Sequence, residues 1–136
     1  MRIAIVGSED KHWTPATREL ACKEIKKILT SDDYMDFHDN NPYDPMYPTF
    51  ISGGCHKGGI DIWAEIISDF IGLEKKIHYP DNNRWHPDGY KDRNDKIAHD
   101  CDVIFCIDPK ERNWSGGRWT LERADFYGKE THLVLI

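Results

Sequence analysis

The sequence predicts an α/β fold, in which one three-layer domain spanning residues 1–136 is built on a mainly parallel sheet of five strands. Short apolar runs alternate along the chain with longer amphipathic stretches. This alternation is typical of a parallel sheet covered by helices on both faces. Several apolar runs end in turns rich in glycine and serine, where a strand passes into a helix. The expected strand order is 3-2-1-4-5.

Composition narrows the class of protein. The chain has 136 residues and a net charge of −6, with 39% hydrophobic residues, which suits one globular domain with a real core. An acidic chain is a poor candidate for binding long nucleic acid, because phosphate contacts require a basic face. No apolar run approaches the length of a membrane span and no signal peptide is evident, so we expect a cytoplasmic protein without a membrane partner. The four cysteines form no Cys-x-x-Cys pair, and we expect neither a metal nor a cofactor.

The first strand and helix follow from an apolar run and a capping signal. Residues 2–6 form a buried strand that ends in a Gly-Ser pair. Thr14 is a favourable N-cap and Pro15 is tolerated at the first helical position, so a helix begins there. It is expected to continue to residue 29, because apolar side chains recur on one face with helical spacing.

Residues 30–48 are the least regular part of the sequence. They contain five aspartates and three prolines, and no strand or helix period. A connection of this length is uncommon in a compact domain and tends to be functional or mobile. We expect an irregular loop that is either solvated or part of a subunit contact.

The centre of the chain is a strand, a glycine turn and a helix. A short apolar run at 50–51 ends in Ser52-Gly53-Gly54, and Gly58-Gly59 precede a helix over 60–71. Glycines allow the backbone to approach a ligand, and a helix N-terminus favours phosphate or carboxylate. Lys57 is the expected charge partner of such an anion. The alternative is a tight turn that binds nothing.

The remainder of the chain repeats this pattern. Apolar runs predict strands, amphipathic runs predict helices, and a Ser-Gly-Gly turn precedes the last helix. In order, we expect a strand over 76–79, a helix over 90–98, a strand over 102–107, a helix over 118–127 and a buried strand over 131–136.

The glycine- and serine-bearing turns indicate a ligand site. Strands of a parallel sheet end at one edge, where α/β proteins bind ligands, so we expect the 52–54 and 115–117 turns to face each other across one cleft. Arg93 could bind a phosphate and Asn94 a sugar or base edge, and one of the loop tryptophans Trp13, Trp85 and Trp114 could stack on a base. The candidate ligand-binding residues are Gly7, Ser8, Ser52, Gly53, Gly54, Lys57, Gly58, Arg93, Asn94, Ser115, Gly116, Gly117 and Thr120. We assign no catalytic residue and no metal ligand.

Motifs spread over most of the chain resemble those of the SLOG superfamily, which groups YspA/YpsA-like and DprA-like proteins with the "lonely guy" phosphoribohydrolases. This resemblance implies a Rossmann-like fold that binds nucleotides or nucleotide-derived ligands. The residues that carry it are Ile5-Val6-Gly7-Ser8, Ser52-Gly53-Gly54, Lys57-Gly58-Gly59, Asp61, Ala64-Glu65, Tyr90, Arg93-Asn94, Ile97-Ala98, Asp102, Ser115-Gly116-Gly117, Thr120 and Ala124.

The match breaks at the last turn. The hydrolase branch carries Pro-Gly-Gly-x-Gly-Thr-x-x-Glu, whose glutamate contributes to N-glycosidic cleavage. Here Ser115 replaces the proline, Trp119 replaces a glycine, and Arg123 occupies the glutamate position. Glu122 lies one residue early, which turns its side chain by about 100° around the helix. Nucleoside deoxyribosyltransferases also place an acid after a late Gly-Thr turn, but their early motif matches poorly.

Three classes of function follow. The favoured one is a module that binds a nucleotide or nucleotide-derived ligand, as a sensor or a sequestering protein. The alternatives are an N-glycosidic hydrolase or transferase acting on nucleotides, and a protein-interaction domain without a ligand. We also expect a homodimer, because the apolar helices exceed what so small a sheet must cover.

Overall fold

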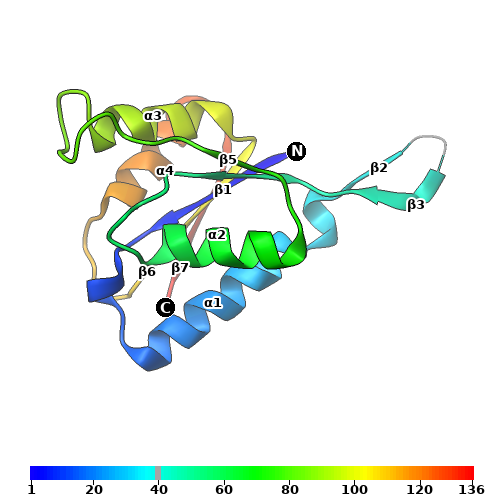
Figure 1. Cartoon of the computed structure of the whole chain (residues 1–136), viewed down its shortest axis with the longest axis horizontal. Coiled ribbons are helices and arrows are strands. Elements are labelled where there is room, and N and C mark those ends of the chain that lie inside the picture. Colours follow the sequence, from blue (N-terminus) through cyan, green and yellow to red (C-terminus); the bar gives the residue numbers. More distant parts are fainter. Residues whose placement is uncertain (39–40) are drawn as a thin grey trace.

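The computed structural model describes residues 1–38 and 41–136, with side chains described outside 37–45. Its centre is a five-stranded, all-parallel sheet in the order β5-β4-β1-β6-β7 (Figure 1). The predicted α/β class and the predicted order 3-2-1-4-5 are therefore confirmed. The strands are β1 (Arg2–Gly7), β4 (Thr49–Ser52), β5 (Lys75–Ile77), β6 (Val103–Asp108) and β7 (Glu130–Leu135).

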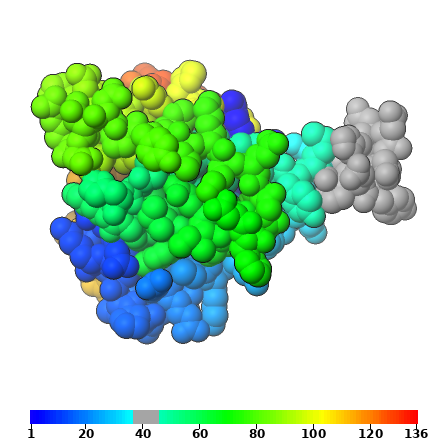
Figure 2. Space-filling view, viewed as in Figure 1, coloured from blue at the N-terminus to red at the C-terminus, as the bar shows by residue number. Residues whose placement is uncertain are grey.

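Four helices cover the sheet as α1 (Pro15–Leu29) and α2 (Ile60–Ile71) on one face and α3 (Tyr90–Asp100) and α4 (Gly116–Phe126) on the other. Successive residues of β1 divide between two cores, because side chains alternate across a strand. Ile3 and Ile5 pack with α1 and α2, whereas Ala4 and Val6 pack with α3 and α4. Atoms of α1 (blue) and α2 (green) lie against each other on one side of the molecule (Figure 2). This is the three-layer, Rossmann-like arrangement that the sequence predicts.

The segment expected as an irregular loop over 30–48 contains regular structure instead. A short 3₁₀ helix, η2 (Asp32–Tyr34), leads into a hairpin of β2 (Asp36–His38) and β3 (Asn41–Met46) that projects from the body (Figure 1). Residues 39–40 of the expected loop lie outside the described residues. Prolines argue against a central strand, but both strands of a two-stranded ribbon are edges, where a missing N–H is tolerated.

The last strand differs from expectation in its burial. β7 lies at the edge of the sheet, and Leu133 and Leu135 remain 45% and 43% exposed. β6, which has neighbours on both sides, is buried throughout. An apolar run alone does not separate a central strand from an edge strand. In the described part of the chain, no helix combines the length and apolar character needed to cross a membrane.

Candidate functional site

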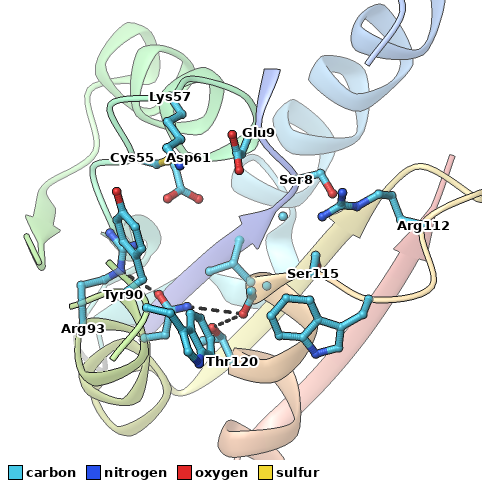
Figure 3. Close-up of a pocket in the computed structure, with 17 residues that line it drawn as sticks. Ser8, Glu9, Cys55, Lys57, Asp61, Tyr90, Arg93, Arg112, Ser115 and Thr120 are labelled. Atoms are coloured by element: carbon cyan, nitrogen blue, oxygen red, sulfur yellow. Dashed lines mark hydrogen bonds between the residues drawn. The ribbon is translucent and has the colours of Figure 1, made fainter. Parts of the chain in front are cut away.

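A cavity of about 200 Å³ opens beyond the carboxyl ends of the strands, where α/β proteins bind ligands (Figure 3). Its walls come from the end of β1, the loops that follow β1, β4, β5 and β6, and the N-terminal parts of α2, α3 and α4. The lining residues are Val6, Gly7, Ser8, Glu9, Cys55, Lys57, Asp61, Trp85, Tyr90, Arg93, Asn94, Arg112, Trp114, Ser115, Gly116, Gly117 and Thr120.

Most of the residues predicted from the sequence line this cavity. Those brought together are Gly7, Ser8, Lys57, Arg93, Asn94, Ser115, Gly116, Gly117 and Thr120. Those outside the lining are Ser52, Gly53, Gly54 and Gly58. The 115–117 turn therefore lines the cavity. The 52–54 turn does not, and this part of the chain contributes only through Cys55 and Lys57, which follow the turn.

The side chain of Arg93 lies against the 52–54 turn, which is why this turn does not line the cavity. Its guanidinium donates a hydrogen bond to the Gly53 carbonyl and, through Nε, another of 2.7 Å to Asn94 Oδ1. Asn94 Nδ2 in turn lies 3.4 Å from the Gly116 carbonyl oxygen. The pair braces the 52–54 turn against α4, so the expectation that the two glycine turns face each other across an open cleft is wrong.

The glycines of the 52–54 turn allow neighbouring side chains to pack closely against the backbone. A Cβ on Gly53 would lie 2.6 Å from Arg93 Nη1, and Gly54 adopts φ of +58° against Ile77. Ser52 donates a 2.6 Å hydrogen bond to Glu65 and accepts one from the Gly54 amide. These residues shape the wall behind Arg93 rather than the cavity itself.

The floor of the cavity is organised by Asp108, the last residue of β6, which is fully buried. One carboxylate oxygen accepts the Ser8 hydroxyl at 2.7 Å, and the other accepts the Ser115 hydroxyl at 2.8 Å. Arg118 Nε donates to the second oxygen at 2.9 Å. Asp108 thus joins the end of β1 to the start of α4.

The N-terminus of α4 opens into the cavity. Ser115 caps the helix by accepting the Arg118 amide, and Gly116 and Gly117 occupy the first turn. Amides of a first turn lack intrahelical partners and, with the helix dipole, favour an anion. Gly117 packs so closely on β1 that an added Cβ would lie 2.9 Å from the Gly7 nitrogen. Thr120, a predicted ligand contact that lines the cavity, donates its hydroxyl proton to the Gly116 carbonyl at 2.8 Å.

The charges around the cavity differ from those of the whole chain. Lys57, Arg93 and Arg112 outnumber the two carboxylates, Glu9 and Asp61, although the chain carries a net charge of −6. Arg112 Nη1 lies 2.7 Å from His12 Nε2. Burial, and then the Arg112 charge, lower the pKa of His12, so this ring stays neutral at pH 7 and adds no second positive charge beside Arg112. The Arg112 Nε atom is buried and has no hydrogen-bond partner among the described residues.

Three aromatic side chains complete the lining. Trp85 meets Trp114 edge-on, with ring centroids 5.6 Å apart, and both line the cavity together with Tyr90. The Tyr90 hydroxyl is buried without a hydrogen-bond partner in the described part of the chain. Trp13, the third loop tryptophan of the sequence, packs on Trp63 and donates to the Ser8 carbonyl at 3.1 Å. Aromatic side chains therefore form part of the cavity wall, but Trp13 is not one of them.

Asp61 is a buried carboxylate in the first turn of α2. Burial raises its pKa from 3.8 to about 6, while the Arg93 charge and the Cys55 backbone act in the opposite direction. Between these pH values the native protein binds one proton more than the unfolded chain. The stability of the protein therefore falls as the pH rises through this interval.

Asp61→Asn removes this titration. The free energy of unfolding of Asp61→Asn, relative to the wild type, should rise by about 2–3 kcal/mol between pH 4 and pH 7 and then level off. Urea denaturation at a series of pH values measures this difference. A constant difference over the whole range would show that Asp61 ionises normally.

Several lining residues were not singled out from the sequence. Glu9 and Arg112 lie in loops, where no periodicity indicates which way a side chain points. Tyr90, at the start of α3, carries part of the motif resemblance but is not among the candidate ligand-binding residues. Asp61 carries part of the motif resemblance but is not among the candidate ligand-binding residues. The signal that could have found Arg112 is its position three residues before the 115–117 turn, within reach of the same helix N-terminus.

No protein-family model, curated protein or solved structure matches this chain. Function is therefore inferred from the residues of the cavity and from their chemistry. Within the described residues, no group of three or more His, Cys, Asp or Glu side chains could hold a metal ion.

Proposed function

We propose that the protein binds a nucleotide or nucleotide-derived ligand in this cavity, as a sensor or sequestering module of the SLOG type. One observation carries the proposal: the same cavity contains both hydrogen-bond donors and aromatic side chains. The donors are Arg112, whose Nε has no partner among the described residues, and the first turn of α4. A nucleotide needs both features, because its phosphate requires donors and its base requires a stacking surface. The motif resemblance to the SLOG superfamily supports the same class of ligand.

The donors that would meet the phosphate come from several elements. The Gly116 and Gly117 amides belong to the first turn of α4, and Arg112 precedes that turn in the same loop. The Arg112 guanidinium points toward Ser8 (Figure 3). Lys57 lies on the other side of the cavity, with its ammonium 5.7 Å from the Tyr90 ring centre. Arg93, whose donors are used by Gly53 and Asn94, acts in this proposal as a brace.

The alternatives receive less support from the cavity. Glu122 is exposed and is not among the lining residues, so a glycosidase mechanism that depends on it has no carboxylate in place. An interaction domain without a ligand would leave the buried donors of Tyr90 and Arg112 unexplained.

A thermal-shift screen tests the proposal directly. Mononucleotides, dinucleotides and NAD-like compounds are added at up to millimolar concentration. A ligand present at 100 times its Kd stabilises the native state by about 2.7 kcal/mol, roughly 5–15 °C for a chain of this size. Absence of stabilisation by every compound would favour the interaction-domain alternative.

A matched pair of variants locates the binding. Arg112→Gln should weaken a stabilising nucleotide about 10-fold to 100-fold, because it removes a charged hydrogen bond. Lys110→Gln removes a positive charge from the same loop, but Lys110 is exposed and does not line the cavity. Equal losses in both variants would indicate a general charge effect rather than a contact.

We further propose a homodimer that uses the outer face of α2. Phe70 and Ile66 on this helix are 90% and 61% exposed, which is unusual for such large apolar side chains. Phe70→Glu should convert the dimer to a monomer, as measured by light scattering at micromolar concentration. A wild-type protein that is already monomeric under these conditions would contradict this proposal.

A further inference from the structure

We propose that Glu9 and Asp61 form a subsite for sugar hydroxyls, so that the ligand is a ribonucleotide with a free vicinal diol and not its deoxy counterpart. This inference rests on the proposed function and specifies the class of ligand that the same cavity binds. It assigns to the two carboxylates a role that neither the fold nor the phosphate site requires.

The cavity is divided into two chemically different sides. Arg112, Ser8 and Ser115 gather on one side, and Glu9, Cys55, Lys57 and Asp61 on the other (Figure 3). The carboxylates of Glu9 and Asp61 point into the space between the two sides (Figure 3). A phosphate held by the first side would place the rest of its nucleotide against the second.

Two elements that pack on each other bring both carboxylates to the cavity. Glu9 caps the 3₁₀ helix η1 (Asp10–His12), and Asp61 lies in the first turn of α2. Gly59, the N-cap of α2, fits against the backbone of Glu9 so closely that an added Cβ would lie 2.6 Å from the Glu9 carbonyl carbon. Both carboxylates also act on the neighbouring Cys55, whose thiol pKa burial raises first and these charges raise further.

The chemistry of this pair selects a neutral hydrogen-bond donor. An ionised carboxylate only accepts hydrogen bonds, so the ligand group opposite it must donate. A second phosphate would be repelled. A cation would be disfavoured, because the Arg93 charge already acts on Asp61 and Lys57 lines the same side. Two adjacent hydroxyls supply two donors without charge, which is how an acidic residue recognises ribose in other dinucleotide sites.

Because Asp61 is buried, its carboxylate depends on hydrogen bonds from the protein or from a ligand. The residue is only 8% exposed, so bulk water cannot fully solvate its carboxylate. Within the described chain, no side chain donates a hydrogen bond to the Glu9 carboxylate and no ion pair involves it. Hydroxyls entering this side would therefore give the Glu9 carboxylate a donor and add a donor to Asp61, on which the Cys55 backbone already acts.

Calorimetric titration of the full chain with AMP, GMP, CMP and UMP, each paired with its 2′-deoxy counterpart, tests the inference. In the wild type, at least one ribonucleotide should bind about 10-fold more tightly than its deoxy partner. Glu9→Gln should weaken that ribonucleotide about 10-fold while leaving the deoxy form unchanged, which removes the discrimination. The control is Asp10→Asn, which removes a negative charge from the same loop, outside the cavity lining.

The outcomes separate the inference from the proposed function. Equal binding of ribo and deoxy partners would overturn the hydroxyl subsite while leaving nucleotide binding intact. Equal weakening of both partners by Glu9→Gln, with a preference that follows the base, would show that the acidic side reads the base and would also overturn it. No binding of any of the eight compounds, to wild type or variants, would overturn the hydroxyl subsite. The proposed function as a whole would be overturned only if the dinucleotides and NAD-like compounds of the thermal-shift screen also failed to stabilise the protein.

Discussion

Asp108→Ala is expected to lower the free energy of unfolding by about 3–5 kcal/mol, the largest effect of any side-chain truncation considered for this protein. The carboxylate is fully buried and accepts hydrogen bonds from Ser8, Ser115 and Arg118. Its removal leaves two buried hydroxyls without acceptors and an arginine without its counter-charge. Urea denaturation at pH 7 measures the loss.

Two further variants show where this loss originates. Asp108→Asn keeps one acceptor oxygen and should fall between the wild type and the alanine variant. Asp125→Ala removes an exposed aspartate from α4, and its effect should stay within about 0.5 kcal/mol. If Asp108→Ala cost no more than Asp125→Ala, the buried carboxylate would not hold β1 to α4.

Gly59→Ala should cost about 3 kcal/mol or more. Gly59 has φ of +77° and ψ of −148°, a region that only glycine occupies readily. A Cβ there would overlap the Ser8 carbonyl oxygen and lie 2.7 Å from the Asp10 nitrogen, so backbone would have to move. Chemical denaturation at neutral pH provides the measurement.

Gly72→Ala is the matched control for this substitution. Gly72 ends α2 with φ of +90°, and a Cβ there would meet nothing within 4 Å. This variant should show only the penalty for a left-handed backbone, about 1 kcal/mol. Similar losses in the two variants would mean that close packing of the 8–10 loop on α2 contributes little.

The fold could be predicted from the sequence because its signals are local and mutually consistent. Thr14 and Pro15 mark the start of α1, and the capping hydrogen bonds of Thr14 are present in the structure. Gly72 ends α2 in the left-handed conformation that the sequence suggests. The strand order then follows from the few topologies open to alternating strands and helices. The sequence does not predict the hairpin of β2 and β3, because Pro42 and Pro45 lie in β3 and proline is unfavourable in most strands.

The site could be predicted only in outline. Glycine turns indicate which edge of the sheet a ligand would approach, but they do not indicate which side chains occupy the intervening space. Arg93 illustrates the limit: an arginine beside a glycine turn can bind a phosphate or a backbone carbonyl, and here it donates to the Gly53 carbonyl. That choice depends on the distance between α3 and the 52–54 turn, which is a property of tertiary packing.

The brace formed by Arg93 and Asn94 bears on the entropy of binding. Through it, α3 connects the 52–54 turn to the first turn of α4 by hydrogen bonds that are buried or partly buried. The conformational freedom of these loops is therefore lost during folding and not during ligand binding. A receptor ordered in advance binds with a smaller entropic penalty than one that orders around its ligand. If the cavity holds the proposed nucleotide, this prior ordering reduces the entropic penalty of binding it.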